Sequence, residues 1–404
     1  MAKDTPSFNI LIAGAGIVGL ATAWRLSLRQ PQLKIAVVEK ESRPGAHQSS
    51  RNSGVIHSGV YYEPGSAKAE NCLRGYRMLL DFADEFRVPY RISGKMIAAV
   101  EEDEIGRLMA IYDKGVANGL AGLEVLDEQG SREAEPHVRA IRSLWVPQAG
   151  IIDYGKVCTV LVTLLQERGV SVYFDHQITD FRRELHHSVL TTQYGEFHTE
   201  LFVNCCGLYA DKIAVLTGMT GAFRIMPFRG EFYRLSGPSE QMINHMVYPV
   251  PDPRFPFLGV HFTPRPGGGI EAGPNAVLAF AREGYRFGTV NVSELVEVLG
   301  YLGFYRMAVR YWRKGLQEMQ RSLSKQAFLK SAQHLVRGVR AEDLTRARSG
   351  VRAQCVGSNG KMIYDYLILE DEYAINLVNA PSPAATSAFS IGEFLADKVL
   401  SKVM

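Results

Sequence analysis

A glycine-rich turn between two apolar runs near the N-terminus constrains the fold more than any other feature of the chain. Residues 8–13 read FNILIA, which suits a buried parallel strand, and GAGIVG follows before a segment with helical apolar spacing. A second apolar run, KIAVVEK, contains Glu39 near its end. The order strand, G-x-G-x-x-G, helix, strand predicts a βαβ unit that binds a dinucleotide.

Each position of this motif has a predicted physical role. Gly14 permits the tight turn, Gly16 lets the backbone approach a pyrophosphate, and Gly19 lets the helix pack closely on the strand. Glu39 follows 25 residues after Gly14, where a carboxylate accepts hydrogen bonds from a ribose. A carboxylate there disfavours a 2′-phosphate, so the motif indicates NAD or FAD rather than NADP.

The loop SSRNSGVIHSGVYY, residues 49–62, follows the second strand and must lie near the dinucleotide. Its small residues let the backbone pass close to a planar ring system, and Arg51 can neutralise pyrophosphate charge. The alternative is a surface loop rich in turn-forming residues. We predict cofactor contacts in this loop from Ser50, Arg51, Asn52 and Ser53.

Composition limits the remaining possibilities. A chain of 404 residues with 46% hydrophobic and 22% charged residues is expected to form two globular lobes. The net charge of +3 does not indicate a nucleic-acid binder. Five scattered cysteines without metal-ligand spacing suit a reducing cytoplasm and predict no metal site. Glycines interrupt the uncharged stretch 5–24, so we expect neither a cleaved signal peptide nor a membrane-spanning helix.

The glycine motif, Glu39 and residues 49–62 resemble the FAD-dependent oxidoreductases of the D-amino acid oxidase superfamily, and more closely its L-2-hydroxyglutarate dehydrogenase/oxidase branch. Further segments agree with this family over nearly the whole chain. They are 201–214 with Gly207 on the adenosine side, 227–235 at the start of the substrate lobe, 261–285 beside the substrate cavity, and 349–354 and 379–399 as closing flavin-binding segments.

The resemblance implies an α/β fold, α+β overall, with a Rossmann-like FAD-binding domain and a discontinuous mixed-sheet substrate domain carrying helices. The FAD domain would combine 1–80, 150–222 and 345–404, and the substrate domain 81–149 and 223–344, with 291–340 as a basic helical region. Backbone N–H groups before the last helix would point at the flavin N1–C2=O edge, in a turn made of Pro383, Ala384, Ala385 and Thr386.

The implied reaction is oxidation of L-2-hydroxyglutarate to 2-oxoglutarate, which requires a base for the hydroxyl proton as hydride leaves. A neutral histidine suits this task near neutral pH. We favour His57 slightly over His261 as the base, with the other histidine positioning the substrate. An amino- or imino-acid oxidase of the same fold, which needs no such base, and a flavin-bearing electron-relay subunit remain as alternatives.

A dicarboxylate substrate needs a cation at each end, and arginine offers a planar fork that matches a carboxylate. Arg352 is the best candidate, followed by Arg229 and Arg282, and Tyr62 could add a hydrogen bond. The related loop of glycerol-3-phosphate dehydrogenases has an arginine where this chain has Tyr61, which argues against a phosphate substrate.

Residues 301–330 carry seven basic residues and one acid, a local charge of +6, interleaved with aromatic residues. Aromatic side chains beside arginines are typical of a surface that settles into lipid headgroups. The interpretation is peripheral attachment to the cytoplasmic membrane face with quinone as the electron acceptor. The alternative is a helical pair whose aromatic residues face the core and whose arginines face water.

Overall fold

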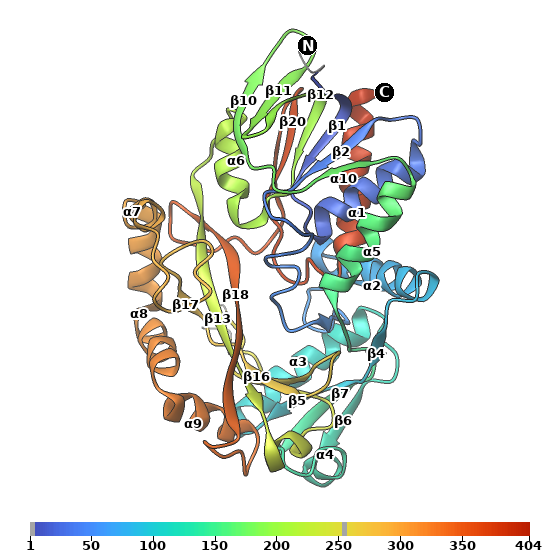
Figure 1. Cartoon of the computed structure of the whole chain (residues 1–404). Helices are drawn as coiled ribbons and strands as arrows, with labels where there is room; N and C mark the ends of the chain where they lie inside the picture. The colour runs from blue at the N-terminus through green and yellow to red at the C-terminus, as the bar shows by residue number, and fades with distance from the viewer. Residues whose placement is uncertain (1–4, 253–256) are drawn as a thin grey trace.

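The computed structural model describes residues 5–252 and 257–404, and its strands form two large sheets and one small one (Figure 1). The predicted βαβ unit consists of β1 (Ser7–Ala13), α1 (Ile17–Arg29) and β2 (Ile35–Val38). β1 is parallel to β2 on one side and to β12 (Gly195–Asn204) on the other. The first sheet has the order β10-β11-β12-β1-β2-β9, with β20 paired to β12 and β19 to β20. The remaining strands of this sheet are β9 (Ser171–Tyr173), β10 (Ile178–Arg183), β11 (Ser188–Thr192), β19 (Leu367–Glu370) and β20 (Ala374–Asn379).

Helices cover the faces of this first sheet because each presents one apolar side. The largest core cluster joins β1, β2 and β12 to α1, α2 (Ala67–Glu85), α5 (Tyr154–Glu167) and α10 (Ala388–Val403). The short α6 (Ala210–Leu216) packs with a second cluster that includes Leu11 and Phe202 of the central strands. Both faces of the central parallel strands are therefore buried, as their continuous apolar sequences predict.

The second large sheet has the order β17-β13-β16-β15-β14-β5-β7-β6, and β18 (Leu344–Gly357) pairs with β13 (Phe223–Leu235). The antiparallel β13–β18 ladder runs from Phe223 opposite Gly357 to Leu235 opposite Leu344. Residues 345–357, which we expected in the FAD domain, thus pair with a strand of the second sheet. The other strands are β5 (Lys95–Ala99), β6 (Glu124–Asp127), β7 (Arg142–Val146), β14 (Met246–Pro249), β15 (His261–Pro264), β16 (Ile270–Gly273) and β17 (Val277–Leu278).

A small sheet of β3 (Val55–Ile56), β8 (Gly150–Ile152) and β4 (Tyr90–Ile92) joins segments that are distant in the sequence. β8 pairs antiparallel with both neighbours, so the loop after β2 is bonded to the segment before α5. Two helices, α3 (Glu102–Ala117) and α4 (Glu128–Ala134), pack on β5 to β7. The chain thus crosses repeatedly between the two large sheets.

The region 291–340 is helical, as predicted, with α7 (Val292–Leu299), α8 (Leu302–Leu323) and α9 (Lys325–Leu335). Figure 1 shows these helices in a column along the outer side of β13 and β18. The inner side of α8 packs through Met307, Phe304 and Tyr311 against Met226 and Val356 of the sheet. Among the described residues, none of the helices combines the length and apolarity needed to cross a bilayer.

Candidate active site

One cavity of about 1100 Å³ extends from the glycine motif to the second sheet. Single small-molecule pockets measure about 300–1,000 Å³, so this volume suits a cofactor together with a small substrate. Its lining includes Gly14 and Glu39 at one end and His57, His261 and Arg352 at the other. The predicted dinucleotide site and the predicted substrate residues therefore belong to one continuous space.

The glycine motif has the close contacts that its spacing predicts. Gly14 has a φ of +100°, and an added Cβ there would lie 2.7 Å from the carbonyl oxygen of Cys205. A Cβ on Gly19 would lie 2.1 Å from the carbonyl oxygen of Gly14, so only glycine lets α1 pack this closely. A Cβ on Gly16 would meet only Ser49 Oγ, at 3.4 Å, but Gly16 faces the cavity. The first turn of α1 thus remains open to a phosphate.

The Glu39 carboxylate is held at the cavity wall by two backbone donors. Ala15 N–H donates to Oε2 at 2.8 Å, and Glu41 N–H donates to Oε1 at 3.0 Å. A carboxylate can accept about four hydrogen bonds, so capacity remains for a ribose diol. Gly207, in the turn after β12, also lines this end of the cavity and has a φ of +51°.

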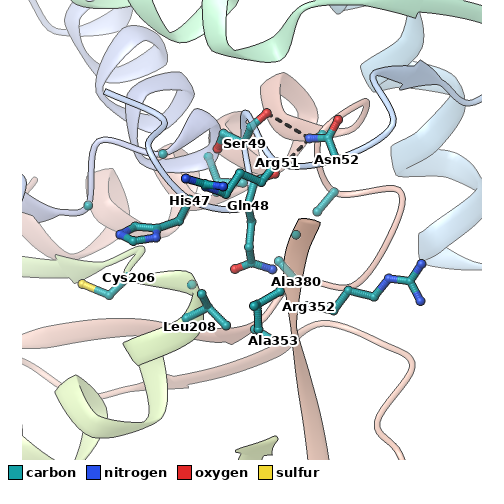
Figure 2. Close-up of a pocket in the computed structure, with 18 of the residues that line it drawn as sticks. His47, Gln48, Ser49, Arg51, Asn52, Cys206, Leu208, Arg352, Ala353 and Ala380 are labelled. Atoms are coloured by element: carbon teal, nitrogen blue, oxygen red, sulfur yellow. Dashed lines mark hydrogen bonds between the residues drawn. The ribbon is translucent and has the colours of Figure 1, made fainter. Parts of the chain in front are cut away.

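The loop after β2 forms the middle of the cavity wall (Figure 2). Arg51, Asn52 and Ser53 line the cavity, whereas Ser50 is not among the lining residues. Asn52 Nδ2 donates to the carbonyl oxygens of Gln48 and Ser49 at 2.9 Å each, so its side chain stabilises the loop itself. The Arg51 guanidinium lies 3.9 Å from the ring centroid of Tyr285, beside the cavity.

The turn before α10 closes the other side of the cavity, and all of Pro383, Ala384, Ala385 and Thr386 line it. Thr386 Oγ1 accepts from the N–H of His57 at 3.1 Å and is 2.9 Å from the hydroxyl of Tyr154. The N–H of Ala384 donates to Pro381 O at 3.0 Å. This N–H group is therefore used within the turn, whereas we expected it to point at the flavin edge. The N–H groups of Ala385 and Thr386 remain as candidates.

The two histidines that the sequence singled out both line the cavity. His261, at the start of β15, donates from Nδ1 to Gly259 O at 2.9 Å. A neutral ring held in this way presents Nε2 as a proton acceptor. The ring of Tyr248 lies 4.0 Å from the His261 ring and fixes its plane. The ring of His57 has no such hydrogen bond within the described residues, so the geometry favours His261 as the base, the reverse of our order.

Both histidines are held in the neutral form. Burial lowers the pKa of His57 to about 3, and the nearby charge of Lys95 adds to this effect. Burial also lowers the pKa of His261 to about 3, opposed by the hydrogen bond to Gly259 and reinforced by Arg352. Both rings are therefore neutral and can accept a proton, but a pKa this low makes each a weaker base than a free imidazole.

Of the three arginines predicted to bind carboxylate, only Arg352 lines the cavity, and Figure 2 shows it on the opposite side from His47 and Cys206. Arg229 is buried and its guanidinium pairs with Glu231 at 3.1 Å. In the ladder Arg352 lies opposite Phe228, so Arg229 is on the other face of β13.

Arg282 pairs with a carboxylate of the protein outside the cavity, whereas we expected it to bind the substrate carboxylate. Its guanidinium makes two contacts with the Asp211 carboxylate, at 2.6 and 3.0 Å, and both side chains are buried. Neither residue lines the cavity. A guanidinium already paired with a buried carboxylate has little capacity for a substrate carboxylate.

Sequence reasoning missed two lysines near the histidines. Lys68, at the start of α2, lines the cavity. Lys95, at the start of β5, is only 1% exposed, and its Nζ lies 4.4 Å from the ring centroid of Tyr248. The lone lysine in the apolar run KMIAA was a signal for a buried charge, whereas Lys68 had none. Tyr62 is not among the lining residues, although its hydroxyl interacts with Ser382, which is.

A polar cluster borders the cofactor end of the cavity. Ligand atoms of Glu41, His47 and Glu283 lie within 4.8 Å of one another among the described residues. The ammonium of Lys40 forms ion pairs with both carboxylates and already supplies a positive charge there. This cluster connects the loop after β2 to the segment before α7, and Lys40 balances one of its two carboxylate charges.

Comparison with known proteins agrees with this geometry. The sequence profile of the FAD dependent oxidoreductase family matches residues 9–398. The chain is 42% identical over 396 residues to the L-2-hydroxyglutarate dehydrogenase of Indibacter alkaliphilus, covering 98% of this chain and 99% of that protein. It is 39% identical over 415 residues to the human mitochondrial L-2-hydroxyglutarate dehydrogenase, covering 98% and 90%.

A solved structure supports the fold independently. The dithionite-reduced L-alpha-glycerophosphate oxidase from Mycoplasma pneumoniae, with FAD bound, aligns with a TM-score of 0.78 and 23% sequence identity. The alignment covers 98% of this chain and 95% of that one. The predicted fold class, a Rossmann-like domain joined to a mixed-sheet substrate domain, is confirmed.

Proposed function

Because the chain belongs to the family of FAD-dependent oxidoreductases and FAD is its cofactor, we propose that it oxidises L-2-hydroxyglutarate to 2-oxoglutarate. The observation that carries the proposal is the meeting of two neutral histidines and Arg352 in the same cavity as the glycine motif. The relatives at 42% and 39% identity bear the name of this activity. A hydroxy acid requires removal of a hydroxyl proton, and these histidines can accept one.

We assign the following roles to the residues that line the cavity. Arg352 binds a substrate carboxylate through its planar guanidinium and orients the reacting carbon. His261 takes the hydroxyl proton at Nε2, since its Nδ1 is committed to Gly259. His57, on the same cavity, orients the hydroxyl group. The residues at the glycine-motif end of the cavity would hold FAD, which would supply the hydride acceptor for the substrate carbon.

The experiment is anaerobic mixing of the FAD-loaded protein with a panel of 2-hydroxy acids and amino acids, while flavin absorbance is followed. We expect rapid bleaching with L-2-hydroxyglutarate and slow or no bleaching with amino acids. Bleaching by amino acids alone would identify an amino- or imino-acid oxidase instead. Absence of bleaching by every member of the panel would favour an electron-relay subunit.

We also propose that the enzyme is cytoplasmic and attaches to the inner face of the cell membrane through α8. The outer side of this helix carries apolar residues at alternating spacings of three and four, with Val309 75% and Trp312 56% exposed. The stripe consists of Leu302, Tyr305, Val309, Trp312, Leu316 and Leu323. An apolar stripe of this size on one helix is unusual for a surface that faces only water.

Charge beside the stripe favours a lipid surface over a second copy of the chain. α8 contains five basic residues and one acid, and that acid, Glu318, is buried and paired with Arg321. Exposed Arg306, Arg310 and Arg313 flank the stripe without acidic neighbours on the helix. They would repel a second copy but attract anionic headgroups, at about 1 kcal/mol for each basic residue. A membrane quinone is then the proposed electron acceptor.

A further inference from the structure

Two lysines beside His57 form no ion pair with a carboxylate within the described residues, although the charge of Asp365 acts on Lys68 from a longer distance. Lys95 is buried on β5 and makes no ion pair there. Lys68 lines the cavity, and its Nζ donates to the carbonyl oxygen of Tyr364 at 3.4 Å. A buried or half-buried ammonium without a carboxylate partner is costly, so such a pair calls for an anion.

Aromatic rings surround these ammonium groups but do not neutralise them. Lys95 Nζ lies 4.4 Å from the ring centroid of Tyr248 and 5.3 Å from that of Tyr61. Lys68 Nζ lies 5.1 Å from the ring centroid of Tyr62. The hydroxyl of Tyr61 is buried and has no hydrogen-bond partner in the described part of the chain. Aromatic faces stabilise a cation partially and leave its positive potential available to a ligand.

Lys68 and Arg352 line the cavity from two different elements, α2 and β18. The charges of both lysines act on His57 and on Cys72. Arg352 acts on His261 and on Tyr248, and Lys95 acts on His261 as well. The cavity therefore offers two positively charged groups, Lys68 and Arg352, to a short substrate that lies beside the two histidines. The expected second cation is neither Arg229 nor Arg282, because both are paired outside the cavity.

We propose that Lys68 binds the second carboxylate of the substrate, supported by the positive potential of Lys95 behind it, while Arg352 binds the carboxylate next to the reacting carbon. This assignment rests on the proposed oxidation of a five-carbon 2-hydroxy dicarboxylate. It makes Lys68 the residue that distinguishes a dicarboxylate from a monocarboxylate of equal length. Lys95 is a positioning residue in this scheme, because it acts through the potential at the site.

The test compares two substrates that differ only at the distal end. L-2-hydroxypentanoate has the chain length of L-2-hydroxyglutarate but a methyl group in place of the second carboxylate. We expect Lys68→Met to lower kcat/KM for L-2-hydroxyglutarate by about 10- to 100-fold, with little change for L-2-hydroxypentanoate. Lys68→Arg should retain most of the dicarboxylate preference. Lys95→Met, which places an apolar side chain of similar length in a buried site, should lower the preference by a smaller factor.

Arg352→Met is the matched comparison, and it should reduce kcat/KM for both substrates. Lys34→Met, at an exposed lysine before β2, is the neutral control. The assignment would be overturned if Lys68→Met left the ratio of the two kcat/KM values unchanged, which includes equal losses of kcat/KM for both substrates. If L-2-hydroxyglutarate does not reduce the wild-type flavin, the proposed function fails. The carboxylate subsite is then tested by flavin difference spectra that measure binding of glutarate and of pentanoate. Lys68→Met must weaken the binding of glutarate more than the binding of pentanoate.

Discussion

His261 Nδ1 lies 2.9 Å from the carbonyl oxygen of Gly259, two residues before it in the chain. This contact orients the imidazole from the segment just before β15, so the ring is positioned without substrate. In the proposed reaction, the free Nε2 takes the substrate proton. We expect His261→Ala to slow flavin reduction by about 10²- to 10⁴-fold and His57→Ala by a smaller factor. Stopped-flow absorbance measures both rates, and the opposite ranking would return the role of base to His57.

Cofactor retention should depend on Gly16 without a loss of folding. A Cβ at this position has ordinary space in the protein but lies on the cavity wall. Gly16→Val should therefore fold and yet lack FAD, because the side chain occupies the place of the pyrophosphate. The ratio of flavin to protein absorbance, together with circular dichroism, measures this outcome. Gly106→Val in α3, where an added Cβ meets nothing within 4 Å, is the control, and full FAD content in Gly16→Val would refute the assignment.

Stability should decline on the acid side because of the buried histidines. Burial lowers the pKa of His57 and His261 from 6.5 to about 3 in the folded protein. Between these values the unfolded chain binds more protons than the folded one, so the free energy of unfolding falls as the pH falls from 6.5 towards 3. Above 6.5 the full contribution is present. Urea unfolding of the FAD-loaded protein at about pH 7.5 and about pH 5.5 measures the slope.

The double variant His57→Leu/His261→Leu is the comparison for this prediction. It removes both titrating groups, so its midpoint should change less between the two pH values than that of the wild type. An equally steep change in the double variant would show that other groups cause the acid sensitivity.

Arg282 and Arg352 should differ in what their removal changes. Arg352→Met should raise KM about 10- to 100-fold, because a desolvated substrate carboxylate loses a charge-assisted partner. Arg282→Met leaves Asp211 buried without its partner, so it should destabilise the protein by about 3–5 kcal/mol. Thermal unfolding and steady-state kinetics on both variants separate these effects. A raised KM in a fully stable Arg282→Met variant would contradict the structural role.

Membrane attachment should require both the charge and the apolar stripe of α8. The wild type should sediment with anionic liposomes at low salt and less at high salt, because exposed charges are screened. Arg310→Glu/Arg313→Glu should remain in the supernatant, and so should Val309→Ser/Trp312→Ser. Lys34→Glu/Lys156→Glu reverses two exposed lysines outside α8 and should sediment like the wild type. Equal recovery of all four proteins in the supernatant would leave the membrane proposal without support.

The cofactor end of the cavity could be predicted from the sequence because its determinants are local. The turn at Gly14, the close packing at Gly19 and the carboxylate of Glu39 lie within one short βαβ unit. The strand, the turn and the helix each specify their own conformation, and the geometry of the next strand then follows. The same locality explains why the helices of 291–340 were expected, since helical spacing repeats over a few residues.

The substrate end depended on the tertiary structure, since it is built from pairs of residues distant in sequence. Arg282 is removed from the site by Asp211, 71 positions earlier, and Arg229 by the strand register that places it on the opposite face from Arg352. Lys68 becomes a cavity residue only because α2 packs beside the loop after β2. An arginine or lysine is available to bind substrate only when it is not paired with a carboxylate of the protein. Such pairing depends on how the elements pack together, which local sequence spacing does not encode.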